Sequence, residues 1–263
     1  MPENMNRSDL ICESDMEKII ADEDAYWEET RGCVKIERVL IKSEEYCRLM
    51  GKPVGSYVSL HFDVSAVFNK KSSENIVSAL SDEIKFILEE NGLKCKRILV
   101  VGLGNPKIAC DSFGARVTEK IYATRSLKDD IEKVPFAMIS VFQHDVFSKT
   151  GIEAIEAIRG ISDSIDPEIV VVADSLVAKN PKRILRTVQI SDSGITPGSG
   201  ISPGQKEINR ESVGRNIITI GVPTAVSYSG DDEKRLFSPC GIEPEIERLS
   251  SAVAKAIEKA FLN

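Results

Sequence analysis

Apolar residues follow two patterns along most of this chain: short continuous runs, and stripes at helical spacing. Four continuous runs are typical of strands that are buried on both faces of a sheet. They occupy residues 98–101, 136–142, 168–173 and 216–222. Residues 112–124, 150–160 and 243–262 place their apolar side chains along one side of a helix. Because these strands and helices alternate with short connections, they predict a parallel sheet with right-handed crossovers.

The chain before residue 97 has a different pattern. Alternating apolar and polar positions predict half-buried strands at residues 34–41 and 57–63, and amphipathic spacing predicts helices at residues 43–50 and 75–91. The acidic N-terminal stretch is expected to form a helix over residues 17–29. The first dozen residues before it have the composition of a disordered tail. This front part is expected to add strands to the sheet that begins at Ile98.

These elements predict the α/β class, with a mostly parallel open sheet and flanking helices. The chain has 263 residues, of which 42% are apolar, and this is enough to build a substantial core. We find no internal repeat and no flexible linker in the sequence. A single domain is therefore expected.

Composition narrows the classes of function. The net charge of −7 argues against non-specific nucleic-acid binding, because no basic stripe offsets it. The six cysteines are scattered singly, which is typical of a reducing compartment. The polar N-terminus does not resemble a signal peptide, and no apolar run is long enough to span a membrane. We therefore expect a soluble cytoplasmic protein.

Two aspartates are the candidate catalytic residues. Asp111 lies between the strand at 98–101 and the helix that follows, and Asp174 comes directly after the strand at 168–173. The carboxyl ends of parallel strands lie at one edge of a sheet, where open α/β folds bind their ligands. Two carboxyl groups there would share one proton, so that the ionised one activates water and the protonated one polarises a carbonyl. The alternative is that Asp111 caps the helix and Asp174 only ends its strand.

Two glycine-containing loops could bind a substrate backbone. The first turns sharply after the strand at 98–101, and the second is the long Gly/Pro/Ser loop at residues 191–204, of a kind that usually lines a site or is disordered. The candidate substrate-binding residues in them are Gly102, Gly104, Asn105, Ser191, Asp192, Gly198 and Gly200. No metal or cofactor is expected, since the chain has only two histidines, His61 and His144. Cys110 could be a nucleophile, but a packed thiol is the simpler interpretation.

Several stretches resemble the germination protease family of spore-forming bacteria, endopeptidases that degrade small acid-soluble spore proteins. They are Lys52-Pro-Val-Gly-Ser-Tyr57, Val100-Val-Gly-Leu-Gly-Asn105, Asp111-Ser-Phe-Gly114, Thr150-Gly-Ile-Glu153, Asp174-Ser-Leu-Val-Ala-Lys179, the run from Thr187 to Gly200, and Ile220-Gly-Val-Pro-Thr224. The matches keep the family's order between residues 7 and 226. Such a series is much more specific than any single motif.

The resemblance implies a fold similar to that of the hydrogenase maturation proteases, a homotetramer, and a catalytic aspartate pair that falls on Asp111 and Asp174. It also implies synthesis as a zymogen. The stretch from Arg7 to Glu13 resembles the family's Arg-Thr-Asp-Leu-Ala processing site. By this likeness, residues 1–9 are a propeptide that is cut off between Asp9 and Leu10, and residues 10–263 form the protease domain. The expected partners are small acid-soluble spore proteins as substrates, in the forespore or spore core, with no nucleic acid and no membrane.

The sequence also departs from the family pattern. Residues 143–149 replace a Pro-Gly-Val-Met-Gly-like loop, Ser112-Phe-Gly-Ala115 replaces Ala-Leu-Gly-Pro, and Lys179 stands where arginine is usual. The region after Val226 is short for the family. Two alternatives therefore stay open. One is a metal-dependent protease of the maturation type, in which Asp111, His144 and a further acid hold a divalent ion. The other is a paralogue that binds spore proteins without cutting them.

Overall fold

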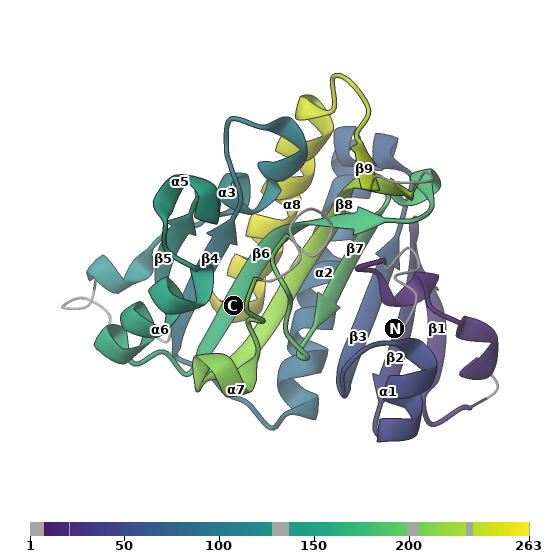
Figure 1. Cartoon of the computed structure of the whole chain (residues 1–263), viewed down its shortest axis with the longest axis horizontal. Coiled ribbons are helices and arrows are strands. Elements are labelled where there is room, and N and C mark those ends of the chain that lie inside the picture. Colours follow the sequence, from purple (N-terminus) through teal and green to yellow (C-terminus); the bar gives the residue numbers. More distant parts are fainter. Residues whose placement is uncertain (1–7, 21, 128–136, 199–204, 230–233, 263) are drawn as a thin grey trace.

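A single nine-stranded sheet runs through the computed structural model, which describes residues 8–20, 22–127, 137–198, 205–229 and 234–262 (Figure 1). The strand order is β1-β2-β3-β7-β8-β6-β4-β5, and β9 pairs with the outer part of β8. The strands are β1 (Tyr26–Arg31), β2 (Val34–Ile41), β3 (Gly55–His61), β4 (Arg97–Leu103), β5 (Met138–His144), β6 (Ile169–Ala178), β7 (Thr187–Ser191), β8 (Asn216–Ser229) and β9 (Lys234–Phe237). The chain thus has the predicted α/β class.

The sheet is mixed, so the prediction that it is mostly parallel was wrong. Strands β5, β4, β6 and β8 are parallel to one another, as their continuous apolar runs indicated. The five pairings that involve β1, β2, β3, β7 and β9 are antiparallel. Short connections explain part of the difference. The pairing of Arg31 with Val34 leaves only Gly32 and Cys33 in the turn, and a two-residue turn can join only antiparallel strands.

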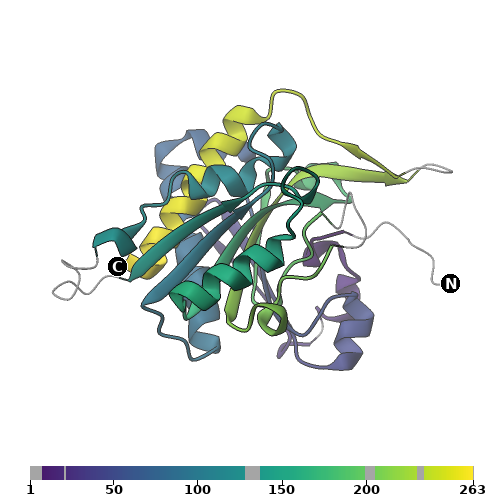
Figure 2. The same ribbon diagram turned by 60° about the vertical axis from the view of Figure 1, so that its left-hand side comes forward.

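Helices cover both faces of the parallel part (Figures 1 and 2). On one face, α2 (Lys70–Glu90), α3 (Phe113–Thr118) and α8 (Glu243–Leu262) pack on the largest apolar cluster, which includes Ile98, Val100 and Val171. On the other face, α6 (Ala154–Ile165) and α7 (Arg210–Val213) cover a second cluster with Leu99 and Val101. The alternation along β4 therefore divides its side chains between two cores. Two short helices, α1 (Glu44–Met50) and α5 (Phe147–Thr150), are also present.

Several predicted helices are present. The α8 helix has the predicted bounds, and α2 begins five residues before the predicted helix and ends one residue before its predicted end. Ser43 caps α1 by accepting the Tyr46 N–H, as predicted. The helix predicted over residues 150–160 instead runs from Ala154 to Ile165, after the single turn of α5. In the described part of the chain, no helix is long and apolar enough to cross a membrane.

The helix predicted over residues 17–29 and the disordered tail predicted before it both differ from the structure. Residues 17–29 form a short 3-10 turn and β1 rather than a helix. Of the predicted tail, residues 1–7 lie outside the described residues, whereas residues 8–13 pack tightly on the protein. Leu10 and Ile11 are both fully buried, because each fills an apolar site on the sheet. The segment is therefore part of the folded protein.

Candidate active site at the ends of β4 and β6

Asp111 is held by the turn that follows β4. Gly104 has a φ of 105°, and a Cβ atom at this position would lie 2.1 Å from the carbonyl oxygen of Asp111. Only glycine permits this close approach. The Asn105 N–H then donates a 2.8 Å hydrogen bond to Oδ2 of Asp111. The two residues after β4 therefore fix the position of this carboxylate.

Asp111 does not cap the following helix. The N-cap position of α3 belongs to Ser112, and Asp111 ends a 3-10 turn of residues 109–111. Its carboxylate is half-buried and directed back to the turn at Asn105. The capping alternative therefore does not describe this residue.

Asp174 lies within β6 rather than after its end, so the predicted strand boundary was wrong. The strand continues to Ala178 because β8 pairs with it along its whole length, with Asp174 opposite Gly221. Alternation along the strand places Asp174 on the same face as Val172 and Leu176. Its side chain is only 5% exposed, and one carboxyl oxygen accepts the Ser175 N–H at 2.8 Å.

Tight packing brings the ends of β4 and β6 and the start of α3 together. A Cβ on Gly102 would lie 2.2 Å from the carbonyl oxygen of Gly114, and a Cβ on Gly114 would lie 2.2 Å from that of Ala173. Gly102 thus allows α3 to approach β4. Across this packing, the charge of Asp111 acts on Asp174.

The two carboxyl groups have unequal environments. Burial raises the pKa of Asp174 well above its ordinary value, and the charge of Asp111 raises it further. Burial also raises the pKa of Asp111, but the Asn105 N–H and the Lys149 ammonium act in the opposite direction. Burial therefore favours the protonated form more strongly at Asp174 than at Asp111. Such a pair can serve as acid and base at the same pH.

The remaining candidates are spread over the end of β7 and its loop. Ser191 is buried and its hydroxyl contacts that of Ser193 at 2.8 Å. The Asp192 carboxylate is bound within the protein: it accepts hydrogen bonds from the Ser56 N–H at 2.7 Å and from the side-chain amide of Asn91 at 2.8 Å. Gly198 has a φ of 64°, and Gly200 lies outside the described residues. Contact of these residues with a substrate remains a prediction.

His144 ends β5 and holds the neighbouring loops. Its backbone carbonyl accepts the Gly104 N–H at 3.1 Å, and its Nε2 contacts the carbonyl of Ile152 at 3.0 Å. Within the described residues, no three His, Cys, Asp or Glu side chains are grouped so that they could hold a metal ion. Burial and the charge of Asp111 raise the pKa of the Cys110 thiol, which disfavours the reactive thiolate.

The N-terminal segment lies against the strand that carries Asp174, which the sequence did not indicate. The Asp9 N–H donates to the carbonyl of Val177 at 3.1 Å, and the Asp9 carboxylate accepts the Val177 N–H at 2.7 Å. Leu10 packs on Leu176 and Ala178. The charge of Asp9 also contributes to the raised pKa of Asp174. The residues on both sides of the predicted processing bond are therefore next to the candidate site.

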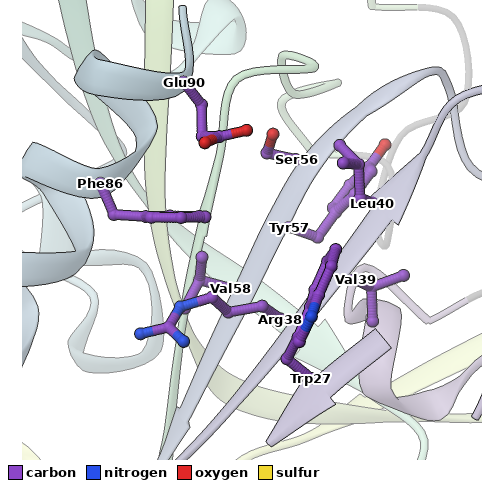
Figure 3. A pocket seen from close by; sticks show the side chains of 9 residues that line it. All are labelled: Trp27, Arg38, Val39, Leu40, Ser56, Tyr57, Val58, Phe86 and Glu90. Carbon is purple, nitrogen blue, oxygen red and sulfur yellow. The ribbon is translucent and has the colours of Figure 1, made fainter. Parts of the chain in front are cut away.

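A separate pocket of about 220 Å³ lies away from the aspartates, between α2 and strands β1 to β3 (Figure 3). Trp27 and Phe86 form its apolar walls, and the Arg38 guanidinium lies 4.9 Å from the centre of the Phe86 ring. Arg38 is held by the buried Glu83 carboxylate at 2.6 Å. Among the residues that line this pocket, Glu90 has the one carboxyl group, so the pocket holds no pair comparable to Asp111 and Asp174.

Comparison with known proteins identifies relatives of this chain. The germination protease family model matches residues 4–233. A germination protease of Caldanaerobacter subterraneus is 36% identical over 207 residues, which cover 76% of this chain and 62% of the relative. Germination proteases of Clostridium perfringens and a Geobacillus species are 36% and 33% identical, covering 73% and 85% of this chain and 60% and 62% of their own lengths. The chain thus spans about three fifths of the length of these curated relatives.

Among solved structures, a NiFe hydrogenase maturation protease from Thermococcus kodakarensis is similar, with a TM-score of 0.40 and 22% identity. The match covers 67% of this chain and 99% of that protein. The match to the family model extends over most of the chain, and the identity to its members exceeds 30% over about three quarters of it. This chain belongs to the germination protease family.

Proposed function

We propose that this protein is an endopeptidase that begins the degradation of small acid-soluble spore proteins, with Asp111 and Asp174 as its catalytic pair. One observation carries the proposal: in a member of the germination protease family, the charge of Asp111 acts on a second aspartate, Asp174, that is more deeply buried. The asymmetry is what acid–base hydrolysis of a peptide bond requires.

In this mechanism the ionised Asp111 takes a proton from a water molecule, and the water oxygen forms a bond to the peptide carbonyl carbon. The carbonyl oxygen takes up the negative charge. The bond between carbon and nitrogen then breaks, and the Asp174 carboxyl gives its proton to the departing nitrogen. The products are a carboxylic acid and an amine. The pair returns to its first state when the proton on Asp111 passes to Asp174.

The proposal includes self-processing. Residues 1–9 would be a propeptide and residues 10–263 the protease domain, with cleavage between Asp9 and Leu10. The contacts of Asp9 with Val177, three residues from Asp174, support this, because they hold the Asp9 backbone beside the strand that carries Asp174. A homotetramer and a location in the forespore or spore core are further parts of the proposal. They rest on the family resemblance alone.

The experiment is incubation of the purified full chain with a small acid-soluble spore protein, followed by mass mapping of the products. An unrelated unfolded protein serves as the control substrate, and Asp174→Asn as the control enzyme. We expect a few defined fragments from the spore protein with the wild-type chain only. An intact spore protein, or identical fragments with Asp174→Asn, would contradict the proposal.

A further inference from the structure

The carbonyl oxygen of Asp9 is bound by two side chains that the catalytic proposal does not use. The Lys52 ammonium lies 2.9 Å from this oxygen, and the Nε2 of Gln189 lies 3.1 Å from it. Lys52 also donates to the carbonyl of Ser8 at 2.8 Å. Both donors therefore meet at the peptide bond that joins Asp9 to Leu10.

The Gln189 amide is fixed in orientation. The residue lies in β7 and is 9% exposed. It pairs with Gly221 of β8, and Gly221 pairs on its other side with Asp174 of β6. Its Oε1 accepts the Ile11 N–H at 2.6 Å, which leaves Nε2 to donate to Asp9. One side chain thus holds the backbone on both sides of Leu10.

The Lys52 ammonium comes from the turn between α1 and β3 and is partly buried. The groups that act on its charge are Asp9, Cys12 and Glu13 of the N-terminal segment, and Lys179 beyond the end of β6. Burial lowers the pKa of Lys52, with a smaller contribution from Lys179. A cation bonded to neutral carbonyls in such a place is a stronger donor than an amide.

The side chains on either side of the bond are also held. The Asp9 carboxylate accepts the Val177 N–H. The Leu10 side chain is fully buried and packs on Leu176 and Ala178. Glu13 closes the segment by accepting the N–H groups of Lys179 and Asn180 at 2.7 and 2.8 Å. An acidic residue, a carbonyl and an apolar residue therefore each have a defined place beside β6.

We propose that Lys52 and Gln189 form a carbonyl-binding site that positions the peptide bond to be cut after an acidic residue. The bond would be that of Asp9 and Leu10 in the chain itself, and later the corresponding bond of a bound substrate. This inference rests on the proposed function. The two donors polarise the carbonyl and stabilise the negative charge that its oxygen acquires when water adds. The Asp174 proton is then available for the departing nitrogen.

The first test measures self-processing of the full chain by intact mass. The variants are Lys52→Met, Gln189→Leu and Lys52→Arg. The matched control is Lys179→Met, which removes a neighbouring positive charge but keeps the contact with Glu13, because that contact is made by the backbone N–H of residue 179. We expect Lys52→Met and Gln189→Leu to lose residues 1–9 at least about tenfold more slowly, as for a lost bond to a charged group. Lys52→Arg should be faster than Lys52→Met. Processing of Lys52→Met and Gln189→Leu at the rate of the Lys179→Met control would overturn the inference.

The second test does not depend on cleavage. In the Asp174→Asn chain, hydrogen exchange at the Leu10 and Ile11 amides reports whether the segment is held. Lys52→Met and Gln189→Leu should each speed this exchange about tenfold, and Lys179→Met should leave it unchanged. Equal exchange in all variants would overturn the carbonyl-binding site even if processing occurs. If the wild-type chain never processes, self-processing fails, and the exchange data still decide the binding site.

Discussion

The negative charge of Asp111 raises the pKa of Asp174, whose carboxyl group is already nearly excluded from solvent. The folded protein therefore binds a proton at Asp174 more tightly than the unfolded chain does. Between the ordinary aspartate pKa and the raised one, the unfolded state has lost this proton while the folded state keeps it. The free energy of unfolding must then fall as pH rises through this window.

Asp174→Asn removes that pH dependence. Below the ordinary pKa of aspartate, the variant and the wild type should unfold with similar free energies. As pH rises, the free energy of unfolding of the variant should exceed that of the wild type by up to about 1.4 kcal/mol more for each pH unit, until the raised pKa of Asp174 is passed. Urea unfolding of both proteins from pH 4 to pH 8 measures the difference. A difference that does not change with pH would show that Asp174 is not held protonated.

Gly104→Ala should impair catalysis more than it impairs folding. The new Cβ would lie 2.1 Å from the Asp111 carbonyl oxygen and 2.9 Å from its Oδ1, so the turn must move and displace the carboxylate. A displacement of this order can cost about a hundredfold in rate. Gly151→Ala is the control, because Gly151 has a similar need for positive φ, at 66°, but no atom within 4 Å of the new Cβ. Equal turnover of the two variants would contradict the role of this turn.

Exhaustive chelation should leave the activity unchanged. The rings of both histidines are engaged, His61 with Thr187 and Glu37, and His144 with the carbonyl of Ile152. A carboxyl pair needs no ion to activate water. Activity is measured on the spore protein before and after dialysis against EDTA. Activity that is lost and then restored by one divalent metal would instead favour the metal-dependent alternative with Asp111 and His144.

Mild acid should convert the full chain to a form that begins at Leu10. Lower pH reduces repulsion between the acidic N-terminal segment and the aspartate pair, so the Asp9 bond can approach the pair more closely. N-terminal sequencing after incubation at pH 5 to 7 checks this, with Asp174→Asn in parallel. A terminus at Leu10 in the wild type alone is the expected result. A terminus at Met1 or Pro2 under every condition would exclude self-processing.

The parallel part of the sheet was predicted well, because each of its strands is a continuous apolar run in the sequence. The apolar runs of β4 and β6 are buried on both faces, and the break at Gly104 is visible as a glycine after a strand. The parallel topology predicted Asp111 and Asp174 at one edge of the sheet, whereas Asp174 lies within β6, where the charge of Asp111 still acts on it. The apolar run breaks at the charged Asp174, which predicts the end of the strand there, but Leu176 to Ala178 resume the apolar pattern and β6 continues through them.

The N-terminal region was mispredicted because its structure depends on partners far along the chain. Glu28 and Glu29 of β1 bond to Lys35 and Arg38 of β2, so charged residues occupy a strand that periodicity cannot identify. The two-residue turn containing Gly32 was the available signal for a hairpin. Gln189 gave no signal of its own, since its contact with Asp9 joins residues 180 positions apart.

The most direct test of the catalytic pair compares Asp111→Asn, Asp174→Asn and Asp145→Asn on the spore protein. Asp145 is the matched control, because it lies near enough to influence the pKa of Asp111 but is itself paired with Lys149 at 2.8 Å. With all three variants folded, as judged by their thermal unfolding, the first two should lose about a thousandfold or more in turnover. Asp145→Asn should stay within about tenfold of the wild type. Near-normal turnover of either Asp111→Asn or Asp174→Asn would contradict the aspartate mechanism.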